Sequence, residues 1–238
     1  MSQLFLVRHG QASFLAADYD ELSSHGRAQS RALGVFWKQQ GLRLDRVICG
    51  PRRRQRDTAL ECLEVFAPEL RDQLEEERAF DEHPGEFLLK DCFQAVMDAD
   101  PEVGKLAQAV AAAADRKARA RATELVLQRT MRLWSRGAFA TGELETWQAF
   151  RERLAAALER ITSAPGSGQN VAVFSSGGAI GALIAGILGV REEAALELGY
   201  AVQNTSVSEL RYSGAQRVTL SRFNSLAHLP DPESWTYR

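Results

Sequence analysis

The run Leu4-Phe5-Leu6-Val7-Arg8-His9-Gly10 decides the fold of this chain. Consecutive large apolar residues, without polar alternation, are typical of a strand that is buried on both faces of a parallel sheet. The run then ends abruptly in a cation, an imidazole and a glycine. In open α/β sheets, ligands bind outside the carboxyl ends of the strands. This order therefore predicts an active site at the end of the first strand, with a nucleophile beside an anion.

Strand-like runs and helical patterns alternate along the rest of the chain. The first predicted helix covers 26–39, and its apolar stripe is formed by Ala28, Ala32, Leu33, Val35 and Phe36. The alternation favours an α/β fold, a three-layer sandwich in which a mostly parallel sheet has helices on both faces. The further predicted elements are strands at 44–49 and 171–174, helices at 59–66, at 147–161 and up to Gly189, and a hairpin of strands at 206–212 and 217–223.

Between residues 87 and 142 the pattern changes, because only helical spacing remains. Val103–Val110 predicts one helix and Leu125–Trp134 predicts another. We expect a single domain over 1–238, with 87–142 as a helical insertion that lies over the carboxyl edge of the sheet as a cap. Its basic run from Arg116 to Arg121 is typical of the solvated face of a helix; the alternative is a cap that attracts a phosphorylated substrate.

The composition excludes several classes of protein. The 29 basic and 31 acidic residues nearly balance, so the overall charge argues against nucleic acid or a membrane surface as a partner. No apolar run approaches the roughly 20 residues that span a bilayer, and the chain enters its first strand without a leader, so we expect a cytoplasmic protein. Cys49, Cys62 and Cys92 form no disulfide or zinc pattern, so no metal site is expected. A homo-oligomer is possible.

Three strand-to-loop junctions carry residues suited to one kind of chemistry: Arg8–Gly10, Pro51–Arg54 and Ser175–Gly178. Because the carboxyl ends of neighbouring strands meet at one edge of the sheet, these junctions are expected to share a ligand. Guanidinium groups present planar donors to phosphoryl oxygens, and neutral imidazole is a good nucleophile near neutral pH. The three junctions together predict one shared ligand, with an anion beside the residues of the first junction.

Residues spaced along nearly the whole chain, apart from the helical insertion, carry a family resemblance. They are, in order, Leu6–Gly10, Leu22-Ser23 with Gly26 and Gln29, Gly50-Pro51 with Arg54 and Thr58-Ala59, Phe80–Glu82, Ser175 with Gly177-Gly178, and Asn224 with His228-Leu229. With these anchors the chain resembles the histidine phosphatase superfamily, whose fold is that of phosphoglycerate mutase. The Arg-His-Gly triplet alone is a weak signal, whereas several anchors in the right order are a specific one.

The resemblance implies that His9 attacks a phosphoryl group to form a phosphohistidine, which water then hydrolyses. Arg8 and Arg54 would hold the phosphoryl oxygens, and the family pattern selects Arg54 from the basic run around it. Glu82 is implied as the general acid and then the general base, with Asp81 and Glu86 as close competitors. This chemistry needs a small phosphorylated substrate, no cofactor and no metal.

One position departs from the family pattern. Where the family carries a second histidine against the phosphoryl group, this chain has Ser176. Its hydroxyl can still donate a hydrogen bond, and Gly177 at the start of a helix can offer a backbone N–H to an anion. The remaining histidines are candidates to compensate for the lost imidazole: His83, which is favoured because it adjoins the predicted acid, His25 and His228.

We therefore expect a cofactor-independent phosphomonoester hydrolase. Ser176 motivates an alternative, a phosphate-binding or regulatory module that has kept the fold and lost efficient catalysis. A phosphoglycerate mutase-type phosphotransferase is the third possibility. Gln11, which we expect among the substrate-binding residues, and Leu15 both depart from the mutase-like members, and these departures favour hydrolysis.

Overall fold

A computed structural model describes the chain apart from residues 13–19, 165, 216 and 238. The described residues form two units: Met1–Glu82 together with Arg153–Arg238, and His83–Glu152. The first unit contains the whole sheet. It also contains all the predicted site residues: Arg8, His9, Gln11, Arg54, Glu82, Ser176 and Gly177.

The sheet of the first unit has six strands in the order β3-β2-β4-β1-β5-β6. Neighbours from β3 to β1 pair in parallel, and β5 is antiparallel to both β1 and β6, so only β5 runs against the others. The strands are β1 (Ser2–Arg8), β2 (Arg46–Cys49), β3 (Glu75–Glu76), β4 (Asn170–Ser175), β5 (Val207–Tyr212) and β6 (Val218–Ser225).

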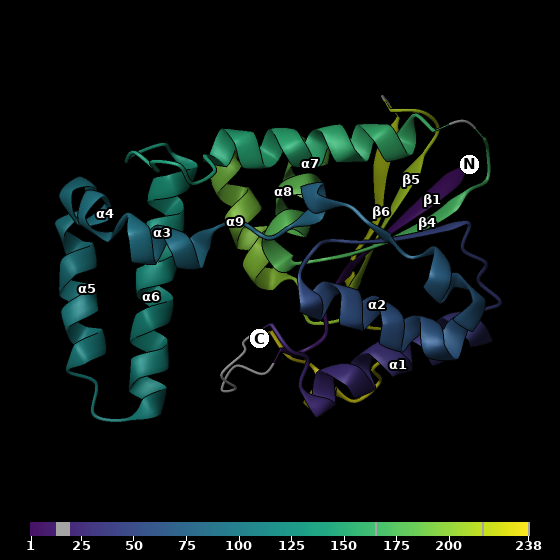
Figure 1. Cartoon of the computed structure of the whole chain (residues 1–238), viewed down its shortest axis with the longest axis horizontal. Helices are drawn as coiled ribbons and strands as arrows, with labels where there is room; N and C mark the ends of the chain where they lie inside the picture. Colours follow the sequence, from purple (N-terminus) through teal and green to yellow (C-terminus); the bar gives the residue numbers. More distant parts are fainter. Residues whose placement is uncertain (13–19, 165, 216, 238) are drawn as a thin grey trace. The chain divides into compact units, whose positions relative to one another are not determined.

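Helices cover both faces of this sheet, with α1 and α2 on one side and α7, α8 and α9 on the other (Figure 1). The predicted three-layer α/β sandwich and its C-terminal hairpin are confirmed. The long helices of the unit are α1 (Ser24–Gln39), α2 (Arg53–Phe66), α7 (Trp147–Thr162, which begins in the other unit), α8 (Gly177–Leu188) and α9 (Glu192–Ala201). Short 3-10 turns are η1 (Pro68–Gln73), η2 (Arg78–Phe80) and η3 (Pro232–Ser234).

The opening strand β1 lies in the middle of the sheet because both of its faces are apolar. Leu4 and Leu6 are fully buried, while Phe5 and Val7 join the core between the sheet and helices α1 and α2. The parallel register pairs Val7 with Phe174 and Arg8 with Ser175. His9 and Ser176 therefore directly follow two adjacent strands, at the same level of the sheet.

The buried face of α1 agrees in part with the predicted apolar stripe, because Leu33 is fully buried and Phe36 packs against the core. Ala28 and Val35 are exposed, and the buried positions include the polar residues Gln29 and Ser30. Burial of Gln29 has a local cause, because its amide oxygen accepts a hydrogen bond from the backbone N–H of Gln11 just after β1. The helix thus also buries polar side chains that support the end of the first strand, and the hydrophobic pattern alone predicts the buried face only in part.

The second unit, His83–Glu152, is described throughout and contains helices without a strand. Its core gathers aromatic rings, with the Trp134 and Trp147 ring centroids 5.2 Å apart and Trp134 and Phe150 5.6 Å apart. The helices are α3 (Gly85–Asp91), α4 (Phe93–Ala99), α5 (Pro101–Ala111) and α6 (Arg116–Ser135). Helices α5 and α6 cover the two segments for which the sequence predicts helices, whereas the short α3 and α4 were not predicted.

Candidate active site

His9 stands directly after β1, and its ring is almost completely buried. Its backbone N–H donates to the Ser175 carbonyl oxygen at 2.8 Å, which ties it to the end of β4. Ring atom Nδ1 lies 2.8 Å from the carbonyl oxygen of Gly10. A carbonyl only accepts, so this contact fixes the proton on Nδ1 and leaves the lone pair on Nε2.

The electrostatic surroundings of His9 keep its imidazole neutral. Burial lowers the pKa of His9 well below its usual value, and the positive charges of Arg54 and Arg8 lower it further. The contact with Gly10 opposes these effects without reversing them. At neutral pH the ring is therefore uncharged and lies close to two guanidinium groups, the state in which an imidazole can act as a nucleophile.

Arg54 lies in the first turn of α2, close to the nucleophilic atom. Its Nε donates to His9 Nε2 at 3.2 Å, which agrees with a lone pair at that atom. Its Nη1 donates to Oδ1 of Asp20 at 2.7 Å, and the other carboxylate oxygen of Asp20 accepts from the backbone N–H of Arg53 at 2.8 Å. Asp20 therefore holds both the start of α2 and the guanidinium group of Arg54.

Arg8 contacts the C-terminal end of α9 and the start of α8. Its Nη1 donates to the carbonyl oxygen of Val202. The start of α8 lies against the same guanidinium group, because a Cβ atom built on Gly177 would be 3.5 Å from Arg8 Nε and only 2.7 Å from the Gly199 carbonyl oxygen. Glycine is therefore required at 177 for the close approach of α8 to α9 beside this arginine.

Glu82 is the predicted carboxylate that reaches the start of α8. Its Oε2 accepts from the backbone N–H of Gly178 at 3.3 Å, in a position where the partial positive charge of the helix start favours an anion. The competitor Asp81 is bound differently, since its Oδ1 accepts from Arg52 Nε at 2.6 Å and from the Glu82 backbone N–H at 2.7 Å. The other competitor, Glu86, belongs to α3 of the second unit.

Ser176 precedes α8 and is fully buried. Its hydroxyl oxygen accepts from Gln55 Nε2 at 2.8 Å, so it faces α2 in the helix turn that also carries Arg54. The carboxyl ends of β1 and β4 and the starts of α2 and α8 thus bring together most of the predicted residues, namely Arg8, His9, Arg54, Glu82, Ser176 and Gly177.

Gln11 has its side chain bound elsewhere. Its amide oxygen accepts from the hydroxyl of Ser23 at 2.9 Å, at the N-terminus of α1. Its backbone N–H donates to Gln29 at 3.1 Å. These contacts give Gln11 a part in holding the loop after β1, and a direct contact with phosphate stays a prediction. Leu15 lies outside the described residues.

The other histidines have contacts of their own. His25 Nε2 lies 3.1 Å from the carbonyl oxygen of Ser234. His228 is buried, its Nε2 lies 3.0 Å from the Thr205 hydroxyl, and burial lowers its pKa to about 4. In the second unit, His83 Nδ1 accepts from the backbone N–H of Gly85 at 3.2 Å, and its ring packs against two core aromatic residues, Trp134 and Phe150.

Several residues that support the site were not predicted. Asn204 Nδ2 donates to the His9 carbonyl oxygen at 2.9 Å, and Thr58 Oγ1 accepts from the Gly10 backbone N–H at 2.9 Å. Asp20 and Gln55 contact Arg54 and Ser176, as described above. Of these, only Thr58 carried a signal in the sequence, as part of the Thr58-Ala59 anchor. The others act through contacts between distant segments, which no local pattern reveals.

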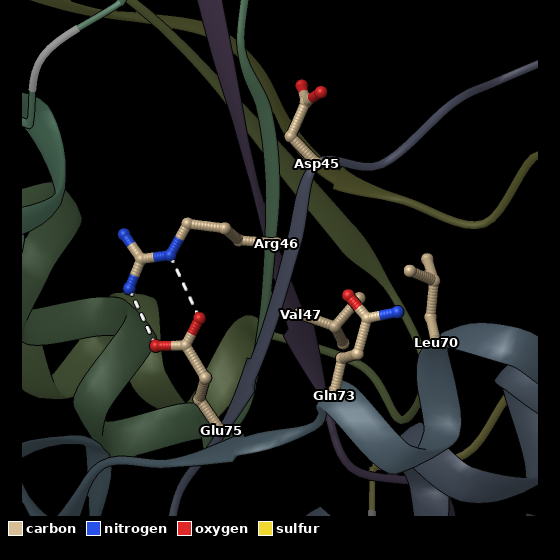
Figure 2. A pocket seen from close by; sticks show the side chains of 6 residues that line it. All are labelled: Asp45, Arg46, Val47, Leu70, Gln73 and Glu75. Carbon is tan, nitrogen blue, oxygen red and sulfur yellow. Dashed lines mark hydrogen bonds and ion pairs between the residues drawn. The ribbon is translucent and has the colours of Figure 1, made fainter.

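A separate hollow of about 230 Å³ lies near the amino end of β2. Figure 2 shows Arg46 and Glu75 facing each other across β2 and β3, with Arg46 Nε 2.9 Å from Oε1 and Nη2 2.7 Å from Oε2 of Glu75. The other lining residues are Asp45, Val47, Leu70 and Gln73. None of the predicted site residues lines this hollow. Arg46 and Glu75 already pair with each other, and Asp45 accepts from the backbone N–H of Asn170.

Two findings bear on the classes of function considered above. Among the described residues, no three or more histidine, cysteine, aspartate or glutamate side chains are grouped as ligands for a metal ion. In the same part of the chain, no helix combines the length and apolar character that crossing a bilayer requires.

Comparison with known proteins identifies relatives of this arrangement. The family model described as the histidine phosphatase superfamily (branch 1) matches residues 4–90 and 110–225. No curated protein matches the chain by sequence.

Solved structures of three enzymes share the fold over nearly their whole length. The phosphoglycerate mutase of Bacillus anthracis is 21% identical, with a TM-score of 0.65 and coverage of 96% of this chain and 95% of that one. A phosphoserine phosphatase mutant from Entamoeba histolytica in complex with phosphoserine is 17% identical, with a TM-score of 0.61 and coverage of 96% and 100%. A mycobacterial glucosyl-3-phosphoglycerate phosphatase is 19% identical, with a TM-score of 0.58 and coverage of 94% and 98%.

Proposed function

Because the chain belongs to the histidine phosphatase superfamily (branch 1), we propose that it is a cofactor-independent phosphomonoesterase that works through a phosphohistidine on His9. The observation that carries the proposal is the state of the His9 ring. Its Nδ1 contact with Gly10 leaves a lone pair on Nε2, beside a buried arginine that can receive a phosphoryl oxygen.

In the first step, His9 Nε2 attacks phosphorus and the bond from phosphorus to the ester oxygen breaks. Arg54 exchanges its contact with His9 for a phosphoryl oxygen, and Arg8 and the backbone N–H groups at the start of α8 stabilise the remaining charge. Glu82 in its protonated form gives its proton to the departing alkoxide. The products of this step are an alcohol and phosphohistidine.

In the second step, water attacks the phosphohistidine. Glu82, now a carboxylate, takes one proton from the water as its oxygen bonds to phosphorus. The bond between phosphorus and Nε2 breaks, and the electron pair returns to the imidazole. The enzyme is regenerated with one water consumed, and inorganic phosphate leaves.

Hydrolysis is favoured over transfer by the sequence departures at Gln11 and Leu15. By their names, the similar structures include both phosphatases and a mutase, so the fold alone is compatible with either reaction. The substrate we propose is a small phosphorylated molecule, and the reaction does not call for nucleic acid or a membrane. We propose a cytoplasmic location.

The test is hydrolysis of p-nitrophenyl phosphate in the presence of EDTA, together with trapping of an acid-labile phosphoenzyme. Wild-type protein should hydrolyse the ester, should be inhibited by vanadate and should carry the trapped phosphoryl group on His9. His9→Ala should lose both turnover and label, whereas His25→Ala, at a histidine that contacts the Ser234 carbonyl oxygen, should keep both. Phosphoenzyme that persists in His9→Ala contradicts the mechanism.

The same experiments separate the alternative functions. Folded protein that binds vanadate but hydrolyses no member of a broad phosphate-ester panel supports a binding or regulatory module. Transfer of phosphate to a phosphorylated sugar acid, without release of inorganic phosphate, supports a mutase.

A further inference from the structure

Gln55 uses all of its side-chain hydrogen-bonding groups inside the protein and is fully buried. Its Oε1 accepts from the backbone N–H of Arg52 at 3.1 Å. Its Nε2 donates to the hydroxyl of Ser176 at 2.8 Å and contacts the carbonyl oxygen of Phe80 at 3.3 Å. Gly50 leaves room for this arrangement, because a Cβ atom there would lie 2.2 Å from Oε1 of Gln55.

These partners allow one orientation of the Gln55 amide. If the amide were rotated by half a turn, its oxygen would face the Phe80 carbonyl oxygen and its NH₂ would face the N–H of Arg52. Both contacts would set like groups against each other in a buried place, which is costly. The amide nitrogen therefore points at Ser176, and the serine oxygen is the acceptor.

The hydroxyl proton of Ser176 is consequently directed away from Gln55. The nearby Phe80 carbonyl oxygen already accepts from Ser175 Oγ at 2.8 Å in addition to Gln55. Among the described residues, Ser176 Oγ has the bond from Gln55 and no acceptor for its own proton. Such a donor is suited to an anion, since Ser176 follows β4 at the level where His9 follows β1.

We propose that Gln55 is a positioning residue that orients the Ser176 hydroxyl as a donor to the phosphoryl group attacked by His9. This inference rests on the proposed phosphoryl chemistry and deepens it, because it states how a serine provides a directed hydrogen bond in this pocket. Gln55 itself acts through Ser176 and does not contact the phosphoryl group.

A double-mutant cycle with Gln55→Met and Ser176→Ala tests the proposal. Methionine is close to glutamine in size and lacks the amide donor. The readouts are the affinity for orthovanadate by calorimetry and kcat/KM for p-nitrophenyl phosphate. Each single variant should lose about tenfold in vanadate affinity, less than the loss of a full oxyanion donor. The double variant should be no weaker than Ser176→Ala alone.

If the loss of vanadate affinity in the double variant equals the product of the losses in the two single variants, the proposal is overturned, because Gln55 would then act independently of Ser176. Unchanged vanadate affinity in Gln55→Met overturns it too. Thr162→Val is the matched control: it removes a buried hydroxyl that bonds within α7 to the Leu158 carbonyl oxygen, and it should leave vanadate affinity unchanged.

A second variant guards against a folding defect in Gln55→Met. In Gln55→Glu, an ionised carboxylate has no donor, so it accepts the Ser176 proton and reverses the hydrogen bond. Vanadate affinity should then fall as the pH rises, and this pH dependence should disappear in the Ser176→Ala background. If it persists in that background, the proposal fails.

Failure of this proposal is distinguishable from failure of the proposed function. If the wild-type protein forms phosphohistidine but the losses of affinity in the two single variants multiply in the double variant, the proposed function stands and the proposed role of Gln55 fails. If the wild-type protein binds vanadate and the cycle shows the expected coupling between Gln55 and Ser176, but no phosphoenzyme forms, the role of Gln55 stands and the phosphohistidine mechanism fails. Absence of vanadate binding overturns the role of Gln55.

Discussion

At the scale of single residues, Asp20 brings a negative charge next to the arginine that we expect to bind phosphate. Its Oδ1 lies 2.7 Å from Arg54 Nη1. A phosphoryl oxygen approaching Arg54 must share the guanidinium with this carboxylate. Asp20 thus holds Arg54 in place when no anion is bound and opposes the binding of an anion.

Replacing Asp20 with asparagine should therefore strengthen the binding of inorganic phosphate. Asparagine can still accept from the Arg53 backbone N–H but removes the competing charge. We expect about a three- to fivefold lower Kd, the range typical of a partly exposed ion pair, measured by calorimetry. Asp57→Asn is the control. Asp57 lies in α2, like Arg54, but its carboxylate is close to Arg27 and Arg53 instead. A weaker affinity in Asp20→Asn would contradict the prediction.

The lowered pKa of His9 predicts how its phosphorylation depends on pH. In the proposed mechanism the neutral ring is the nucleophile, so phosphorylation of His9 should be lost only as the pH falls through the pKa of His9 in the folded protein. An ordinary histidine would be about half protonated near pH 6.5. We expect the single-turnover rate of phosphoenzyme formation to stay nearly constant from about pH 7 to about pH 6. Rapid-quench measurements that show a fall centred near pH 6.5 would contradict this expectation.

At the scale of elements, the start of α8 depends on its close packing against α9. A Cβ atom at Gly181 would lie 2.4 Å from the Gly199 backbone nitrogen and 2.5 Å from the Ala195 carbonyl oxygen. Neither backbone atom can move without shifting α9. The packing therefore fixes the helix start that carries Ser176 and Gly177.

Two glycine-to-alanine changes in this one helix should have opposite effects. Gly181→Ala should lower the free energy of unfolding by about 1–3 kcal/mol, because overpacking forces the backbones apart. Gly186→Ala should raise it by about 0.5–1 kcal/mol, since nothing lies within 4 Å of its added Cβ and alanine is the better helix former. Urea denaturation of both variants measures the two changes, and equal changes would show that the contact between α8 and α9 is not tight.

The elements that the sequence predicts well are those with a strong local pattern. The apolar run of β1 and the small apolar residues up to Gly189 lie where expected, and α8 ends at Leu188, directly before Gly189, which has a φ of 62°. The same reasoning missed α9 and the two-residue β3, whose formation depends on what they pack or pair against. The face of α1 was predicted in part: Leu33 is buried as expected, whereas Gln29 is buried for hydrogen bonds that the apolar pattern does not reveal.

The candidate site follows the same rule. Arg8, His9 and Arg54 lie at strand and helix ends that the sequence marks, so their convergence could be predicted. Asp20 and Gln55 could not be, because their roles depend on contacts across 34 and 121 residues of sequence. Hydrogen bonds between distant segments leave no periodic signal in the chain.

At the scale of the whole molecule, the reactivity of the three cysteine thiols can follow the unfolding of each unit separately. Cys49 and Cys62 are buried in the unit that carries the sheet, and Cys92 is buried in the helical unit. Burial raises the pKa of Cys49 to about 11 and also raises the pKa of Cys62 and Cys92. In the native protein all three thiols should be unreactive, because the thiolate is the reactive form.

Increasing urea should expose Cys92 to alkylation before Cys49 and Cys62. The helical unit is the smaller of the two, and a smaller unit buries a smaller fraction of its surface. Pulse alkylation followed by mass spectrometry assigns each thiol at each urea concentration. Simultaneous labelling of all three would mean that the two units unfold as one cooperative body.

The central place of β1 has a consequence for synthesis of the protein on the ribosome. Its neighbours in the sheet, β4 and β5, begin at Asn170 and Val207. At roughly 5–20 residues per second on the ribosome, β1 is made on the order of ten seconds before either partner exists. For that time the nascent chain carries an apolar segment that has no strand to pair with, a segment that chaperones bind and that aggregates readily. The segment that bears His9 is therefore translated well before the strands that pair with it, and it can take its place in the sheet only once they have been made.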